Sequence, residues 1–166
     1  MDLLAPQPLA PHHSTVGFDC GDSGLNHWLR QRAHSNQQSG ATRCFVVCNN
    51  DGIVKAYVAL ASGAVAVASA PGRFRRNMPD PIPVVVLARL AVCRSDQGRG
   101  IARAMLADAF ERVLQASTQI GVRGIVVHAA SDQARRFYLH MGFDPSPIDP
   151  DTLLIRLSDV AATLPF

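Results

Sequence analysis

Lysine and glutamate are almost absent from this chain of 166 residues. Its 16 basic residues include one lysine, Lys55, and its 13 acidic residues include one glutamate, Glu111. The other acids are aspartates that fall mostly in predicted turns, so obvious catalytic bases are scarce. This scarcity argues against an enzyme that must deprotonate a lysine side chain, whose amine titrates at about 10.4.

Long apolar runs and metal-binding motifs are also missing. No stretch approaches the roughly 18 apolar residues of a membrane span, and Met1-Asp2 does not begin a basic leader. We therefore expect neither a transmembrane segment nor a signal peptide. The four cysteines form no C-x-x-C pair and the six histidines no H-E-x-x-H motif. The expectation is a cytoplasmic protein with reduced thiols and no metal site.

The most informative segment is Gln97–Ala102, with the sequence Gln-Gly-Arg-Gly-Ile-Ala. An apolar run at residues 84–92 precedes it, and a segment with helical periodicity, about 103–117, follows. A strand, a glycine-rich turn and a helix start direct free backbone N–H groups and the positive end of a helix dipole at one point. Gly98 and Gly100 let a ligand approach the backbone closely. The segment predicts a phosphate or pyrophosphate site; the alternative is a plain glycine turn in an α/β domain.

Two common phosphate-binding loops do not match this segment. A Walker A loop needs Lys-Ser/Thr after its last glycine, where this chain has Ile101 and Ala102. A dinucleotide fingerprint needs glycine or alanine at Arg103 and an acid about 20 residues later, and residues 119–123 contain none. What remains is Gln-x-x-Gly-x-Ala between a strand and a helix.

Arginines are clustered. Between Arg73 and Arg103, seven arginines accompany only two acids, and Arg30, Arg32 and Arg43 form a second group. Guanidinium groups bind phosphate oxygens in a bidentate fashion, so this clustering predicts a polyanionic partner. A solvated basic loop is the alternative, and codon bias contributes to the choice of arginine over lysine.

The residue pattern predicts one α/β domain with a mixed sheet over residues 15–166, preceded by a loose arm at 1–14. Strands are expected at 42–48, 53–60, 84–92, 124–129 and 153–157. Helices are expected from about residue 24 to 35, over 103–117, and from a cap at Asp132 to Gly142.

Over about residues 15–160 this order resembles the GNAT fold of acyl-CoA N-acyltransferases, and Gln-x-x-Gly-x-Ala resembles its acetyl-CoA pyrophosphate loop. Further blocks resemble the GNAT toxins of bacterial toxin–antitoxin pairs. They are Gly17–Gly21 before Leu25–Leu29, Asn36–Arg43, His128–Ser131 before Ala134–Tyr138, and Pro145–Pro150. The resemblance implies a toxin that acetylates the α-amino group of aminoacyl-tRNA and stops translation. It also implies a ribbon-helix-helix antitoxin and suggests a homodimer.

The same resemblance implies which residues contact acetyl-CoA. The strand at 90–92 would pair with the pantetheine amides, and the loop would hold the pyrophosphate. The expected contacts are Leu90, Ala91, Val92, Gln97, Gly98, Arg99, Gly100, Ile101, Ala102, Arg103, Ser131 and Phe137. Gln97 is open to a second interpretation, as a loop residue that faces solvent.

Tyr138 stands where the family has its catalytic tyrosine. A phenol with a pKa near 10 can protonate a leaving thiolate with a pKa near 8.5; the alternative is a core tyrosine. An α-amino group titrates at about 7.7–8.0, which reduces the need for a base. His128 is either such a base or a buried structural histidine.

Six arginines are expected to face the tRNA: Arg30, Arg32, Arg75, Arg76, Arg89 and Arg94. Arg89 could instead pair with a buried acid. Two other functions remain open. One is a GNAT enzyme for a small amine such as a polyamine or an aminoglycoside, although cationic substrates favour an acidic cleft. The other is an acyl-CoA-binding regulator without catalysis.

Overall fold

The computed structural model describes residues 2–163. The longer strands are β2 (Arg43–Cys48), β3 (Val54–Val65), β4 (Ile82–Val92), β5 (Gly124–His128) and β7 (Thr152–Arg156), and the two-residue strands are β1 (Gln7–Pro8) and β6 (Asp144–Pro145). The helices are α1 (Ser23–Gln31), α2 (Ala33–Ser39), α3 (Gly72–Arg75), α4 (Ile101–Ala116), α5 (Asp132–His140) and α6 (Leu157–Thr163), with short 3-10 turns at Val67–Ser69 and Arg94–Asp96.

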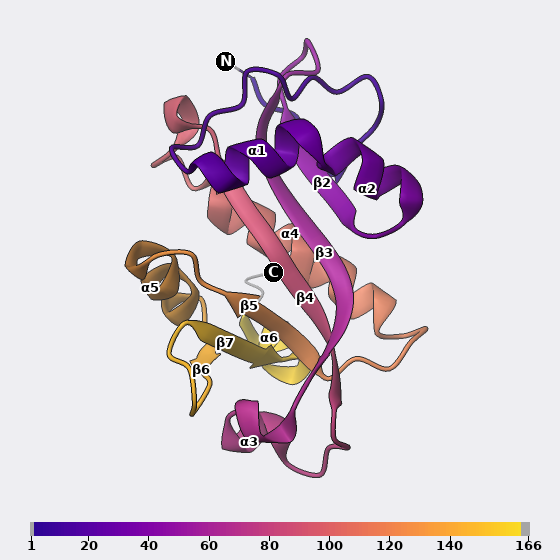
Figure 1. Ribbon diagram of the computed structural model, residues 1–166, viewed down its shortest axis with the longest axis vertical. Coiled ribbons are helices and arrows are strands. Elements are labelled where there is room, and N and C mark those ends of the chain that lie inside the picture. The colour runs from indigo at the N-terminus through magenta and orange to yellow at the C-terminus, as the bar shows by residue number, and fades with distance from the viewer. Residues whose placement is uncertain (1, 164–166) are drawn as a thin grey trace. The chain divides into compact units, whose positions relative to one another are not determined.

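The seven strands form one mixed sheet in the order β1-β2-β3-β4-β5-β7-β6 (Figure 1). Strands β4 and β5 pair in parallel, whereas β1–β2, β2–β3, β5–β7 and β6–β7 pair antiparallel. The expected α/β class and mixed sheet are confirmed. The chain divides into two compact units, Met1–Ala61 with Ala88–Ala109, and Ser62–Leu87 with Phe110–Phe166.

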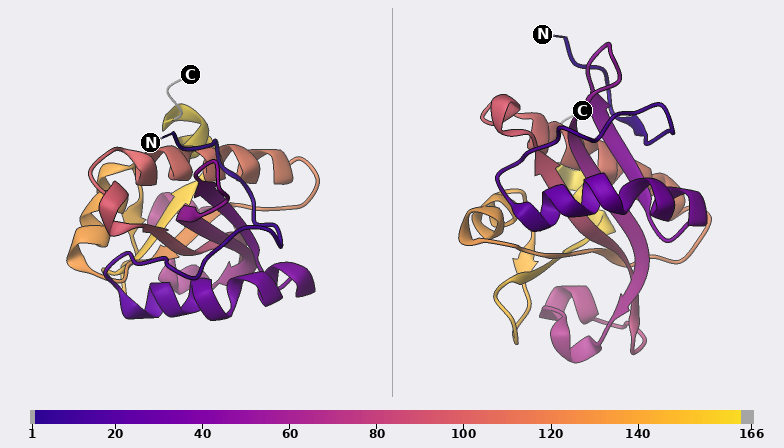
Figure 2. Two further views of the ribbon diagram at one scale, coloured as in Figure 1. Left: turned by 90° about the horizontal axis from the view of Figure 1, so that it is seen from above. Right: turned by 45° about the horizontal axis from the view of Figure 1, so that its top comes forward.

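In the first unit, α1 and α2 lie together across one face of β2 and β3 (Figures 1 and 2). Their buried side chains Trp28, Leu29 and Ala33 belong to one apolar cluster with residues of both strands. The Tyr57 hydroxyl donates to the carbonyl oxygen of Leu25 at 2.7 Å, which ties β3 to α1. The expected single helix is two helices that meet at Arg32. Asp22 caps the first by accepting from the Leu25 amide.

The N-terminal segment differs from the loose arm expected of residues 1–14. Gln7 and Pro8 pair with Val46 and Phe45 of β2, and Leu9 is buried in the apolar cluster of the first unit. No strand was predicted here because the pairing covers two residues, one of which is proline. The segment is held instead by its pairing with β2 and by the burial of Leu9. Met1 lies outside the described residues.

The second unit places its core under α3 and against β5 and β7. Phe74 of α3 is buried with Ile82, Val126 and Leu154. The β4–β5 ladder runs from Val84↔Gly124 to Leu87↔Val127. The N-cap of helix α5 lies one residue before the expected position: the side chain of Ser131, not that of Asp132, accepts from the amide of Ala134. Helices α3 and α6 were not predicted, because four and seven residues are too short to show a helical period.

Gly124 is required by the close approach of β5 to β7. A Cβ at this position would overlap the carbonyl oxygen of Ile155 and lie 2.7 Å from Cε2 of Phe74. We expect Gly124→Ala to lower the free energy of unfolding by about 3 kcal/mol, as overpacking against backbone does. The measurement is the urea midpoint. Gly121→Ala is the matched control, because a Cβ there meets nothing within 4 Å; equal midpoints for the two variants would contradict this packing.

Candidate active site

The loop after β4 has the backbone geometry of an anion site. Gly98 and Gly100 both have φ of +79°, and a Cβ on either would enter open space. Helix α4 starts directly after Gly100 and runs for 16 residues, so its first amides are free to bind an acceptor. The empty space over both glycines fits a pyrophosphate held by the expected residues 98–102.

Side chains around the loop hold it in place. The Gln97 amide donates to the carbonyl oxygens of Cys20 (3.0 Å) and Val92 (2.9 Å). Arg99 pairs with the buried carboxylate of Asp96 at 2.9 Å. Arg103 is exposed at the start of α4. Gln97 therefore joins the end of β4 to the Gly17–Gly21 segment, a role that its place in the motif did not reveal.

Four of the six arginines expected to face the tRNA lie in the first unit, in different surroundings. The Arg30 guanidinium donates to the carbonyl oxygen of Phe18, and Arg94 lies 3.5 Å from the Asp19 carboxylate. Arg89 stacks on the ring of Trp28, 4.8 Å from its centroid, so a cation–π contact replaces the acid that was considered for it. Arg32 is exposed. Arg30 and Arg94 thus converge on residues 18 and 19, next to the partner of Gln97.

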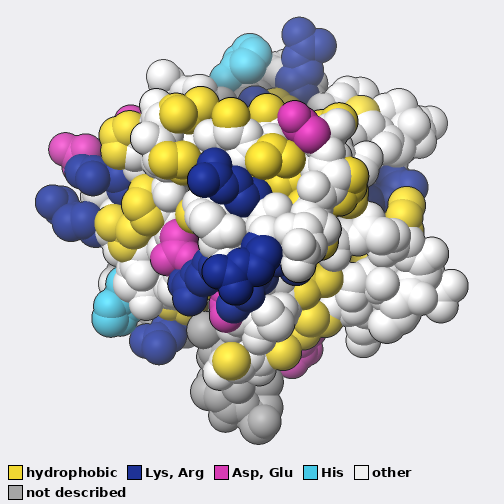
Figure 3. All heavy atoms as spheres, turned by 90° about the horizontal axis from the view of Figure 1, so that it is seen from below, with side chains coloured by type: hydrophobic (Ala, Val, Ile, Leu, Met, Phe, Trp, Pro, Cys, Tyr) yellow, Lys and Arg dark blue, Asp and Glu magenta, His cyan; other side chains and the backbone are white. Residues whose placement is uncertain are grey.

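Arg75 and Arg76 are exposed at the end of α3 in the second unit. Neighbouring side chains fix this short helix. Arg123 donates to the carbonyl oxygens of Phe74 (2.7 Å) and Arg73 (2.9 Å), and Arg73 pairs with Asp144 at 2.6 Å. Basic side chains gather on the face shown in Figure 3, with acidic side chains among them. The acidic side chains partly neutralise the positive charge of this face, and the side chains of Arg75 and Arg76 are accessible to solvent.

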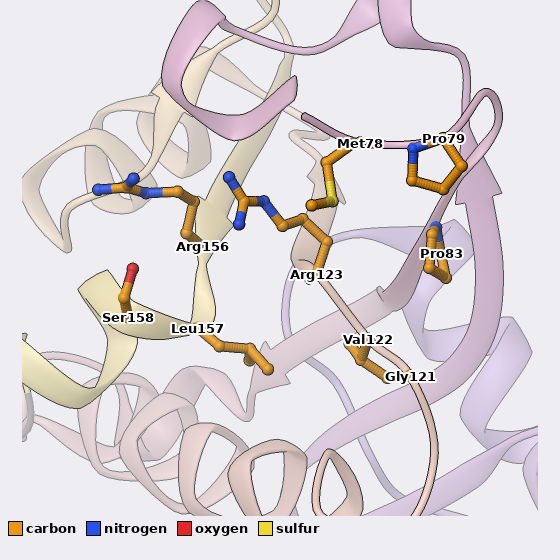
Figure 4. Close-up of a pocket in the computed structure, with 9 residues that line it drawn as sticks. All are labelled: Met78, Pro79, Pro83, Gly121, Val122, Arg123, Arg156, Leu157 and Ser158. Atoms are coloured by element: carbon orange, nitrogen blue, oxygen red, sulfur yellow. The ribbon is translucent and has the colours of Figure 1, made fainter. Parts of the chain in front are cut away.

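A shallow pocket of about 340 Å³ lies in the second unit, beside Arg123. Met78, Pro79, Pro83 and Val122 give it an apolar wall, and the guanidinium groups of Arg123 and Arg156 lie side by side at its edge (Figure 4). Burial, followed by the charge of Arg156, lowers the pKa of Arg123. Asp159 binds Arg156 through both carboxylate oxygens, at 2.9 and 3.1 Å. None of the residues predicted for catalysis lines this pocket.

Tyr138 is held by aromatic packing. Its ring contacts Phe137 and Phe143 edge to face, with centroids 5.2 and 5.3 Å away, and the residue is 5% exposed. Burial raises the pKa of Tyr138 above its usual value, so the hydroxyl stays protonated at neutral pH and holds its proton more tightly than a solvated phenol does. Phe137 is half-buried, and Ser131 serves as the N-cap of α5.

His128 is exposed at the end of β5, which corrects the interpretation as a buried structural histidine. Its Nδ1 lies 3.0 Å from Oγ1 of Thr152, its register partner on β7. The Thr152 hydroxyl in turn donates to Oδ2 of Asp149 at 2.8 Å. Nothing in the spacing of residues 128, 149 and 152 pointed to this chain of hydrogen bonds, because antiparallel pairing creates it.

No group of three or more His, Cys, Asp or Glu side chains within residues 2–163 could hold a metal ion. None of the helices there is long and apolar enough to cross a membrane.

Comparison with known proteins places these features in a family. Residues 40–145 match the model of the acetyltransferase (GNAT) domain. A tRNA-acetylating toxin of Mycobacterium tuberculosis is 48% identical over 160 residues, 96% of each chain. The structure of AtaT complexed with acetyl-methionyl-tRNAfMet has a TM-score of 0.89 at 28% identity, covering 97% of this chain and 98% of that one. A variant AtaT bound to the C-terminus of the antitoxin AtaR and acetyl-CoA has a TM-score of 0.81 at 26% identity, covering 98% and 97%. The chain belongs to the GNAT family of acetyltransferases.

Proposed function

We propose that this protein is a toxin that transfers the acetyl group of acetyl-CoA to the α-amino group of aminoacyl-tRNA and thereby blocks translation. The observation that carries the proposal is the 48% identity, over 96% of both chains, to a tRNA-acetylating toxin. The solved structure with acetyl-methionyl-tRNAfMet supports the same substrate class. An acetylated α-amino group cannot attack the ester that links a growing peptide to its tRNA. The charged tRNA can therefore no longer accept the peptide in elongation.

The residues of the chain divide the chemistry between them. The amides of 98–102 hold the pyrophosphate of the cofactor, and the backbone of Leu90–Val92 pairs with its pantetheine arm. Acetyl-CoA supplies the thioester that the amine attacks. Tyr138 donates its hydroxyl proton to the sulfur that leaves, a role that its protonated state suits.

The relatives support a proposal about the partners of this protein. The AtaT variant is bound to the C-terminus of its antitoxin, and we expect an antitoxin of the ribbon-helix-helix class to hold this protein. We expect it to work in the cytoplasm, where charged tRNA is found, and to form the homodimer that the family resemblance suggests. Its contacts with the tRNA backbone are expected from Arg30, Arg32, Arg75, Arg76, Arg89 and Arg94.

Arg75 and Arg76 give the sharpest test of the tRNA contact, because both are exposed. We expect Arg75→Glu with Arg76→Glu to raise KM for aminoacyl-tRNA about tenfold or more, because contacts with phosphate groups are lost. Each lost contact should also lower the salt dependence of binding. The affinity for acetyl-CoA should not change. Arg112→Glu, on α4, is the control for the added negative charge. An unchanged KM and salt slope would remove α3 from the tRNA interface.

Transfer of labelled acetyl groups tests the function itself. Purified protein is incubated with labelled acetyl-CoA and with charged tRNA, deacylated tRNA or spermidine in separate reactions. We expect label on charged tRNA only. Label on spermidine alone would assign the enzyme to the small-amine acetyltransferases. Binding of acetyl-CoA with no transfer would indicate a regulator.

A further inference from the structure

The hydrogen bonds around His128 determine which of its ring nitrogens carries a proton. The Asp149 carboxylate only accepts, and bonds from the Asp151 amide and the Thr152 hydroxyl lower its pKa, so it is ionised at neutral pH. The Thr152 hydroxyl has one proton and gives it to Asp149. Oγ1 of Thr152 must therefore accept from Nδ1 of His128, 3.0 Å away. In the neutral imidazole, Nε2 then keeps its lone pair.

His128 lies at the end of the sheet where a ligand is expected. It is the last residue of β5, directly after the Leu87↔Val127 pair that ends the parallel ladder with β4. In open α/β sheets, ligands bind beyond the carboxyl ends of parallel strands. The side chain is exposed, and four residues later the chain enters α5, which carries Tyr138. The charged groups beside it are Asp149 and Asp151 of the loop before β7, with Arg135 of α5, which pairs with Asp151 at 3.6 Å.

We propose that Nε2 of His128 is the general base that takes a proton from the α-amino nitrogen during acetylation, with Thr152 and Asp149 as positioning residues. This inference rests on the proposed function. When the C–N bond forms and the C–S bond breaks, an ammonium group loses two protons and sulfur gains one. Tyr138 supplies the proton for sulfur and is restored from solvent. The ammonium group gives its first proton to solvent before the attack, and His128 takes the second from nitrogen and passes it to solvent. Two protons thus reach solvent and one returns to Tyr138, so one proton is released overall.

The first test is the pH dependence of kcat/KM for aminoacyl-tRNA. Catalysis by the wild type requires both the amine and His128 to be unprotonated. At low pH, the logarithm of kcat/KM should therefore rise with pH with a slope of about two. We expect His128→Gln to lower kcat/KM about 100-fold and to reduce that slope to about one. His140→Gln, an exposed histidine at the end of α5, is the matched control. An unchanged rate, or a lower rate with the slope still about two, would overturn the assignment.

The second test reads the proton position without catalysis. A long-range proton–nitrogen NMR correlation of the full chain, assigned with His128→Gln, should show Nδ1 protonated and Nε2 bare. Thr152→Val should disturb this tautomer and lower kcat/KM on the order of tenfold, and Thr152→Ser, which keeps the hydroxyl, should restore both. A proton on Nε2 of the neutral wild-type ring would overturn the proposal. Absence of transfer by the wild type would refute the proposed function instead.

Discussion

Replacing Tyr138 by phenylalanine should lower kcat for acetyl transfer by about 100- to 10,000-fold, the range that a lost general acid gives. The substitution removes one oxygen and keeps the ring that packs on Phe137 and Phe143. Folding and the affinity for acetyl-CoA should therefore be close to wild type. Single-turnover kinetics with charged tRNA, beside calorimetric titration of acetyl-CoA, measures the two effects separately.

Tyr57→Phe is the matched control for this result. Its hydroxyl donates to the Leu25 carbonyl oxygen in the core of the first unit, so its loss should reduce stability by about 1 kcal/mol and leave kcat unchanged. Retention of wild-type kcat by Tyr138→Phe would mean that another group, or water, protonates the leaving sulfur. It would remove Tyr138 from the mechanism but leave the fold assignment intact.

Gly100→Val should raise the Kd for acetyl-CoA at least tenfold. The φ of +79° is costly for a β-branched residue, by roughly 1–2 kcal/mol. The added side chain also enters the open space in which the pyrophosphate would meet the loop amides. Calorimetric titration with acetyl-CoA provides the measurement.

The control for the loop variant is Gly17→Val, because Gly17 also has open space for a Cβ and lies in the same unit without a positive φ. This variant should bind acetyl-CoA as the wild type does. Thermal unfolding of both variants separates backbone strain from loss of the ligand site. Wild-type affinity of Gly100→Val would show that the cofactor is held elsewhere.

Local patterns in the sequence predicted much of the fold. The glycines at 98 and 100, the apolar face of α4 and the five longer strands were predictable, because each depends on neighbours within about a turn or a strand. Strand β1 and helices α3 and α6 were not, since their order comes from tertiary contacts. The pairing of Gln7 with Val46 is one example, and the bonds from Arg123 to the carbonyl oxygens of α3 are another.

The candidate site divides in the same way. The roles of Tyr138 and the loop were predicted from short motifs and their resemblance to a family, and both stay predictions. The motif identified Gln97, but it did not predict the hydrogen bond from Gln97 to the carbonyl oxygen of Cys20, 77 positions away. His128 was noticed as a possible base, yet its exposure and its bond to Thr152 depend on which strand β5 pairs with. Only a known sheet order reveals such a contact.

The most direct test of the central claim is the chemical position of the transferred acetyl group. Charged tRNA treated with the protein and acetyl-CoA is digested with ribonuclease, and the 3′-terminal aminoacyl-adenosine is analysed by mass spectrometry. We expect one added acetyl group on the α-amino nitrogen of that fragment, and we expect no such group when the Tyr138→Phe variant is used. An acetyl group on a nucleobase, or an unmodified fragment from an active enzyme, would contradict the claim.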